Sequence, residues 1–362
     1  MVRHRLGRAF LSGCTSQTTL TGRRAFSSSA TCFKVPVPTF TQTSSPELDG
    51  LLQKFRDRLF IPTWLSLADK KLLFRQSKAA DLEKNPVVVN VGTKEMVDNY
   101  TLRPMKITDL PTTAELSTAL KLLKTEEDWR NVIPLLTGFH SAKRPITQPI
   151  MEMIIRLAGE QGMEGIVLQA ASQSRVTGLY LSNPDIARTL LFAIRQKVQK
   201  ANFTGPDIHL AIKQARAALQ LMEAPEHTNA TPANDPKRLP SVLGMMLELK
   251  AAYALDKPGA HDRDWGIRSL GRAIVNTWHL ENLTVPCSWS EGNWVLRTYI
   301  PLWHGLDLAL KVEEVKADTV LQQKLERNKA ELAKAIEGTI ELVERERAQL
   351  THMVEWSKSV YQ

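Results

Sequence analysis

The chain has 362 residues, of which 43% are hydrophobic and 23% charged, and its 47 Lys and Arg outnumber its 38 Asp and Glu to give a formal net charge of +9. Three cysteines are too few for a disulfide-rich secreted scaffold. The sequence contains no run of 18 apolar residues, so no membrane span is predicted. The apolar content is sufficient for a sizeable core in one or two units.

The first 46 residues contain no acidic side chain. Their basic residues stand among Ser, Thr and small apolar residues: Arg3, Arg5, Arg8, Arg23, Arg24 and Lys34. This composition is typical of a mitochondrial transit peptide, and we predict that residues 1–33 are one and that the protein works in the mitochondrial matrix. Without them, 42 basic and 38 acidic residues leave a net charge of +4, which permits an RNA partner without demanding one.

Residues 34–46 hold three prolines together with Ser and Thr, which predicts an extended arm. Residues 47–110 are expected to form N-terminal helices and a connector, because apolar residues recur at three- and four-residue steps from Leu48 to Leu59 and again from Trp64 to Phe74. A β-branched run at 87–91 predicts one short strand or an extended connector. A single run of this kind cannot form a sheet.

Residues 111–222 show the clearest internal order. Thr112, Thr147 and Ser182 follow one another at intervals of 35 residues, and each stands where a helix N-cap belongs. A second helix is predicted within each interval, over residues 126–139, 163–174 and 206–222. Two helices per 35 residues are typical of stacked αα-hairpins, in which no hairpin buries its apolar face alone. An irregular helical bundle with chance spacing is the alternative.

A helical hairpin of 35 residues in a mitochondrial protein resembles the pentatricopeptide family, whose members bind RNA or belong to the mitochondrial ribosome. The resemblance covers about residues 110–222 and implies an all-α, solenoid-like stack of hairpins. In style the chain is similar to the subunits of fungal mitochondrial ribosomes. The paired Asn, Asp, Ser or Thr residues with which the family reads bases do not recur here, so the resemblance implies an architecture and no base code.

The remaining segments differ in composition. Residues 223–240 hold four prolines and predict a loop or hinge. Residues 241–305 form a Trp-rich helical region, since five of the eight tryptophans lie between Trp265 and Trp303. Residues 306–362 lack proline and place apolar residues at near-heptad steps, which predicts a long amphipathic helix or a hairpin of two.

Sequence motifs that carry catalysis are missing, including GxxxxGK[ST], GxSxG and HExxH. The polar cluster at 261–264 (His-Asp-Arg-Asp) is interpreted as a loop and helix start, because Asp is favoured at a helix N-terminus. Cys287 lies eight residues after His279 and 17 before His304, spacings that match no zinc-ligand rule. We therefore predict no catalytic, cofactor-binding or metal-binding residue.

Basic residues gather mostly within and just after the predicted repeats, where they are candidates for contacts with RNA phosphates. Ordinary solvated helix faces would explain them equally well. The candidates are Lys143, Arg144, Arg188, Arg195, Lys197, Lys200, Lys213, Arg216, Lys237 and Arg238.

Together these features predict a non-enzymatic structural component of the mitochondrial ribosome that supports mitochondrial translation. Its partners would be ribosomal proteins and rRNA, with no small-molecule substrate and no cofactor. One alternative is a free mitochondrial RNA-binding factor that acts on transcript stability or translation. The other is an assembly factor for a respiratory complex.

Overall fold

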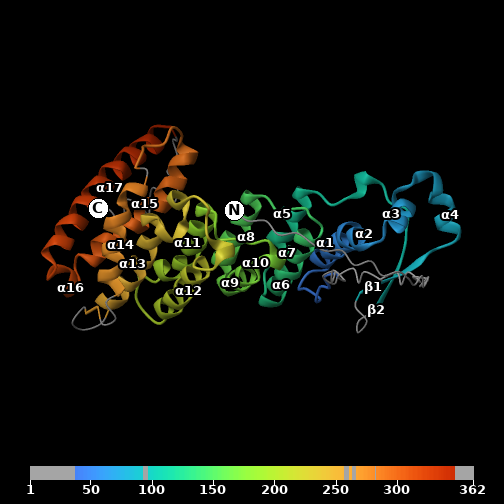
Figure 1. Ribbon diagram of the computed structural model, residues 1–362, viewed down its shortest axis with the longest axis horizontal. Coiled ribbons are helices and arrows are strands. Elements are labelled where there is room, and N and C mark those ends of the chain that lie inside the picture. Colours follow the sequence, from blue (N-terminus) through green and yellow to red (C-terminus); the bar gives the residue numbers. More distant parts are fainter. Residues whose placement is uncertain (1–36, 93–96, 257–260, 263–265, 282, 347–362) are drawn as a thin grey trace, which may run out of the picture. The chain divides into compact units, whose positions relative to one another are not determined.

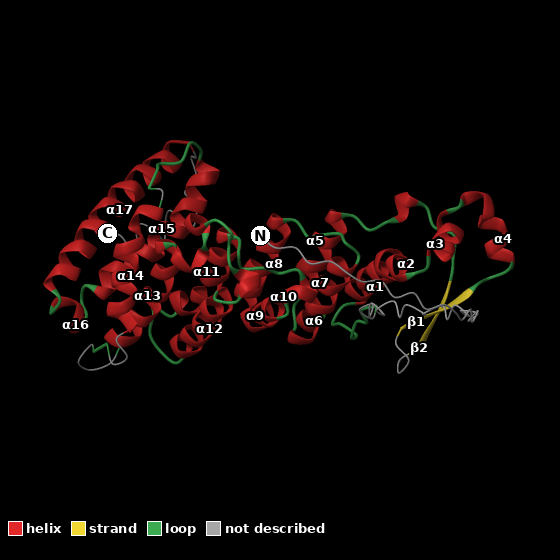
Figure 2. Ribbon diagram, viewed as in Figure 1, coloured by secondary structure: helices red, strands yellow, loops and turns green. Residues whose placement is uncertain are grey.

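The computed structural model describes residues 37–92, 97–256, 261–262, 266–281 and 283–346. Within these ranges helices follow one another with short connections, and two short strands are the exception (Figures 1 and 2). The predicted all-α class is confirmed. The predicted transit peptide and the predicted helix beyond Glu346 lie outside the described residues.

Residues 37–45 form no helix and lie against α6 (Glu126–Arg130) and the turn that follows it. The Ser44 backbone N–H donates to Asp128 Oδ1 at 2.7 Å, and the Thr41 backbone N–H donates to Asn131 Oδ1 at 2.9 Å. Burial alone would raise the pKa of Asp128, but hydrogen bonds from Ser44 and from the Thr125 and Lys124 backbone hold that pKa far below its usual range. The arm is thus anchored by a charged acceptor.

The N-terminal helices follow the predicted amphipathic pattern. They are α1 (Pro46–Phe55), a π-helical turn (Arg56–Phe60), α2 (Ile61–Trp64), α3 (Leu67–Phe74) and α4 (Ala79–Lys84). The valine run then forms β1 (Val88–Gly92), which pairs antiparallel with β2 (Val97–Thr101). The expectation that this run has no partner strand was wrong, because the two β-branched residues of β2, Val97 and Thr101, are separated by Asp98 and Asn99, which are rare in strands.

Three hairpins follow, each made of a first and a second helical segment. They are α5 (Thr113–Leu122) with α6 and α7 (Val132–Ser141), α8 (Gln148–Gln161) with α9 (Glu164–Ser172) and α10 (Ser174–Thr177), and α11 (Pro184–Lys200) with α12 (Asp207–Met222). The first helices pack in the order α5, α8, α11, and the second helices in the order α7, α9, α12 (Figure 1). Packing in two parallel rows is what stacked αα-hairpins require.

The hairpin starts agree with two of the three predicted N-caps. Thr112 accepts from the Glu115 backbone N–H in a capping box, and Thr147 precedes α8 with Pro149 in the first turn. The third cap is Asn183 and not Ser182, because the Asn183 side chain accepts a hydrogen bond from the Asp185 backbone N–H at 2.9 Å.

Further helices extend the stack after residues 223–240, which contain three short 3-10 turns. They are α13 (Pro240–Leu255), α14 (Gly266–Thr277), α15 (Trp289–Ala309), α16 (Glu313–Lys316) and α17 (Thr319–Glu346). Helix α11 packs on α13, α13 on α15, and α15 on α17. The expected start of the last helix at residue 306 was wrong, since Leu306 belongs to α15, which continues through Pro301, and the long helix begins at Thr319.

Helix α13 connects the two apolar cores of the described chain. Its residues Met245 and Leu249 belong to the core of the N-terminal helices and repeats, whereas Leu243 and Leu247 belong to the core formed with α14, α15 and α17. Nearly every α13 side chain is buried, which explains why this helix has no polar face. Its two buried polar side chains, Ser241 and Glu248, accept hydrogen bonds from Arg188 and Arg195 of α11.

Candidate functional site

The ten predicted RNA-contact residues do not form one uniform set. Six of them have exposed side chains: Lys143, Arg144, Lys200, Lys213, Arg216 and Arg238. Lys197 lies 2.7 Å from Asp207 Oδ1, and Lys237 lies 3.0 Å from Glu223 Oε2. The other two, Arg188 and Arg195, point toward neighbouring helices.

Arg195 is fully buried between α11 and α13. Its guanidinium donates to both carboxylate oxygens of Glu248 at 2.6 and 2.8 Å, and His304 Nδ1 lies 2.7 Å from the same carboxylate. Burial by itself would raise the pKa of Glu248, but the charge of Arg195 and the contact with His304 hold that pKa below its ordinary value. The prediction that Arg195 contacts RNA was wrong, because this side chain joins two helices in the interior.

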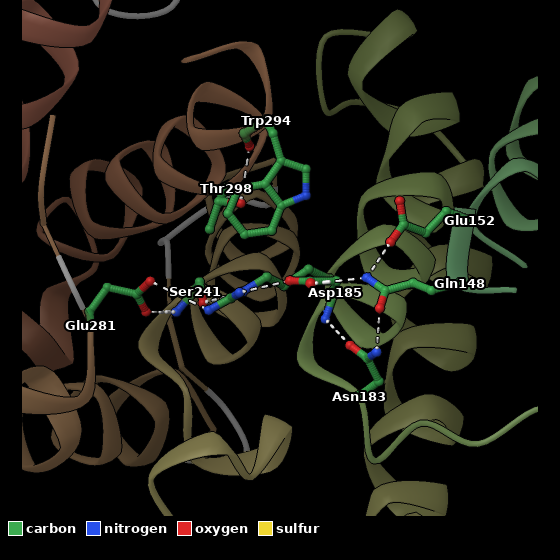
Figure 3. Close-up of polar contacts among 9 residues, drawn as sticks. Gln148, Glu152, Asn183, Asp185, Ser241, Glu281, Trp294 and Thr298 are labelled. Atoms are coloured by element: carbon green, nitrogen blue, oxygen red, sulfur yellow. Dashed lines mark hydrogen bonds and ion pairs between the residues drawn. The ribbon is translucent and has the colours of Figure 1, made fainter. Parts of the chain in front are cut away.

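Arg188 is held in a polar network by Asp185, Ser241 and Glu281, which are labelled in Figure 3 and lie beside Trp294 of α15. Its guanidinium lies 3.3 Å from Asp185 Oδ1, donates from Nε to Ser241 Oγ at 3.0 Å, and lies 3.7 Å from Glu281 Oε1. The guanidinium also covers the indole of Trp294 at 5.4 Å from the ring centroid. Asp185, Ser241 and Glu281 thus hold the Arg188 guanidinium in place against the partly exposed ring of Trp294.

The same network reaches α8 through amide side chains. Gln148 Nε2 donates to Glu152 Oε1 at 2.8 Å and to Asp185 Oδ2 at 3.1 Å, and Asn183 Nδ2 donates to Gln148 Oε1 at 2.9 Å. Figure 3 shows these residues on one side of Asp185, with Ser241 and Glu281 on the other and Trp294 beside the network. The relative placement of α8, α11, α13 and α15 at this point is therefore fixed by directional contacts.

A pocket of about 180 Å³ opens beside this network between α8, α11, α13 and α15. Arg156, Arg188 and Arg297 line it together with Phe192 and Trp294. The volume is below the roughly 300–1,000 Å³ of pockets that enclose whole small-molecule ligands. Three guanidinium groups at one small opening favour an anionic group over a neutral substrate.

Comparison with known proteins places the chain in a family. The sequence pattern of the family described as mitochondrial ribosomal protein mS27 matches residues 24–362. The chain belongs to this family. A curated relative, the small ribosomal subunit protein mS27 of Neurospora crassa, is 26% identical over 233 residues, which are 61% of this chain and 58% of the relative. The aligned part of the chain thus spans little more than half the length of that mS27 relative.

Membership of the mS27 family confirms the predicted mitochondrial location and the predicted kinship with mitochondrial ribosomal proteins. The match covers most of the chain, including the Trp-rich region and α17, whereas the pentatricopeptide resemblance rested on residues 110–222 alone. The family assignment therefore applies to the whole array of hairpins that the structure describes.

The remaining polar clusters of this mS27 family member have structural partners. Asp262 Oδ2 accepts from the Arg268 backbone N–H at the start of α14, and Glu314 accepts from the Asp262 backbone N–H and contacts His261. Cys287 is exposed and has no bonded cysteine partner. Among the described residues, no group of three or more His, Cys, Asp or Glu is arranged to hold a metal ion, and no helix is long and apolar enough to cross a membrane.

The sequence interpretation missed Arg156, Arg297 and the pocket role of Trp294. Arg297 and Trp294 come from α15, which is more than 100 residues from α8 in the chain, so no local spacing brings them to Arg156. The concentration of tryptophans in the α15 region was the one available signal, but it suited a helical core as well as a docking face and did not indicate which arginines border the pocket.

Proposed function

We propose that this chain is a non-enzymatic structural component of the small subunit of the mitochondrial ribosome, where it contacts rRNA and neighbouring proteins and supports mitochondrial translation. The family match over residues 24–362 carries the proposal. The name of the Neurospora crassa relative supplies the small subunit as the host. The structure contributes an array of stacked helices, which suits contacts with several neighbours at once.

The charge distribution supports RNA contact by the exposed members of the predicted set. Lys143 and Arg144 lie in the connection between α7 and α8, Lys200 lies at the end of α11, and Lys213 lies on α12. Their side chains are exposed and form no ion pair with the described residues, so the full positive charge is available to phosphates. Lys197 and Lys237 are weaker candidates, because carboxylates already neutralise them.

The experiment that tests the proposal is sedimentation of mitochondrial lysate through a sucrose gradient, with antibody detection of this chain. A structural component should migrate with small subunits and stay with them in high salt. If the chain migrated in a light particle that RNase treatment disrupts, the result would instead support a free RNA-binding factor. Association with an inner-membrane complex that resists RNase would support an assembly factor. Either of these results would contradict the proposal.

A further inference from the structure

The pocket between α8, α11, α13 and α15 combines an aromatic surface with three arginines and one glutamate. Trp294 is 37% exposed although it stands in a core helix, and the Arg188 guanidinium beneath it is held in place by Asp185, Ser241 and Glu281. A large aromatic side chain that is only partly covered provides a flat apolar surface at low conformational cost.

The three arginines differ in how far their charge is compensated. Arg188 is bound by two carboxylates, and Arg156 Nη1 lies 2.9 Å from Glu160 Oε1. Arg297 has no carboxylate at ion-pair distance among the described residues, and its guanidinium lies over the ring of Phe192 at 5.9 Å. Partial burial and then the charge of Arg156 lower the pKa of Arg297, whereas the charges of Glu160 and Glu152 act in the opposite direction. An anion held by Arg297 would favour its charged form.

We propose that this pocket binds one unpaired nucleotide of RNA, with its base stacked on Trp294 and its phosphate held by Arg297 and Arg156. The inference rests on the proposed function, which brings the chain into contact with RNA. Proteins that bind single strands pair a cationic path for phosphates with aromatic rings for bases. A pocket of about 180 Å³ takes only part of one nucleotide, with the rest of it at the opening, and is too small for a duplex.

An acidic peptide is the competing occupant. It would use the arginines, but it has no flat ring system to match the exposed face of Trp294. Glu152 also lines the pocket, and Gln148 donates a hydrogen bond to its Oε1. This carboxylate repels phosphate and carboxylate alike, so the aromatic surface of Trp294 is the feature that favours RNA over an acidic peptide.

The first test measures affinity of the full chain for a fluorescein-labelled single-stranded RNA 12-mer of mixed sequence by fluorescence anisotropy between 50 and 200 mM KCl. Trp294→Leu should weaken binding by roughly 5- to 150-fold, the range that stacking of one base supplies. Trp294→Phe should retain most of the affinity. Arg297→Gln should lower the slope of log affinity against log salt by about 0.7, because one phosphate contact is lost.

Matched controls separate this pocket from general surface effects. Trp289→Leu removes a tryptophan of the same helix with nearly equal exposure, 39%, that does not line the pocket. Arg130→Gln removes an exposed arginine of α6. Both should leave affinity and salt slope unchanged. The proposal is overturned if Trp294→Leu and Arg297→Gln, shown by thermal unfolding to be folded, bind the 12-mer as the unchanged chain does.

The second test uses purified mitochondrial small subunits, irradiated with ultraviolet light and digested, with the RNA-bearing peptides mapped by mass spectrometry. An adduct on the peptide that contains Trp294 is expected. A chain that sediments with small subunits but forms a protein cross-link and no RNA adduct at Trp294 would overturn the pocket assignment and leave the proposed function intact. A chain that does not sediment with small subunits would contradict the proposed function itself.

Discussion

Arg195 shows how one residue can connect two hairpins of the stack. It is fully buried and shares both oxygens of Glu248. We expect Arg195→Met to lower the free energy of unfolding by about 3–5 kcal/mol, because it leaves the buried Glu248 carboxylate without its arginine and with the His304 contact alone. Urea unfolding followed by circular dichroism at neutral pH measures the loss.

The double variant Arg195→Met with Glu248→Met supplies the control for this prediction. Replacement of both charges by apolar groups of similar volume often restores stability. We expect the double variant to be more stable than Arg195→Met alone. Equal instability of the two would mean that the shape of the site matters and the uncompensated charge does not.

Asp128 should make the stability of the arm contact depend on pH. Its folded pKa lies below the unfolded value of about 3.9, so its stabilising contribution is complete above that value and is lost as the pH falls through it toward the folded pKa. Asp128→Asn should cost about 1–3 kcal/mol at neutral pH, since one of the backbone donors loses its acceptor.

The pH dependence of the free energy of unfolding shows whether Asp128 acts through its charge. The difference in free energy of unfolding between the unchanged chain and Asp128→Asn should shrink below about pH 4, where the unfolded carboxylate becomes protonated. Glu127→Gln, a change at the exposed neighbouring position, is the comparison. A difference that stays constant from neutral to acidic pH would show that Asp128 does not act through its charge.

Residues with local partners were predictable from the sequence, and residues with distant partners were not. Thr112 and Glu115 lie three positions apart and form the capping box that such spacing favours. Arg195 finds its partner 53 positions away in Glu248. The sequence around Arg195 resembles that of a solvent-exposed basic residue on a helix, because its burial comes from α13, which lies later in the chain.

The same limit applies to whole elements. Amphipathic periodicity located the second helices of the repeats to within a few residues, since one face of each is solvated. Helix α13 is buried on all sides and lacks that signal. The absence of proline after residue 305 suggested that the last helix begins at residue 306. Helix α15 instead continues through Pro301 to Ala309, so tertiary packing prevailed over local propensity.

Close approach of α13 and α15 depends on glycine. A Cβ on Gly305 would lie 2.7 Å from the carbonyl oxygen of Gly244 and 3.0 Å from the backbone N of Glu248. We expect Gly305→Ala to destabilise the chain by about 1–3 kcal/mol, because two backbones would have to separate. Thermal unfolding measures the change, and the same separation should loosen the pocket beside α13.

Gly50→Ala is the matched variant for this prediction. It lies inside α1, where a Cβ would meet nothing within 4 Å. Alanine is the better helix former by roughly 0.5–1 kcal/mol, so this change should raise stability slightly. If Gly305→Ala behaved like Gly50→Ala, the contact between α13 and α15 would be looser than the structure shows.

For the molecule as a whole, attachment to ribosomal RNA should depend on exposed cations of the repeats. We expect the combined change Lys143→Glu, Arg144→Glu and Lys213→Glu to weaken association with salt-washed small subunits. Loss of about three phosphate contacts should lower the slope of log affinity against log salt by roughly 2–3, because each contact releases counterions. Cosedimentation at 50, 100 and 200 mM KCl measures the slope.

The control is a second triple variant, in which three exposed basic residues of α17 are replaced by Glu: Lys324, Arg327 and Lys334. It changes the net charge by the same amount. If the general field of the protein governed attachment, both triple variants would lose affinity equally. Loss in the α17 variant alone would place the RNA-facing surface on the C-terminal hairpin. Because stacked hairpins bury only their mutual faces, all six positions can change without loss of folding, which thermal unfolding should confirm for both variants.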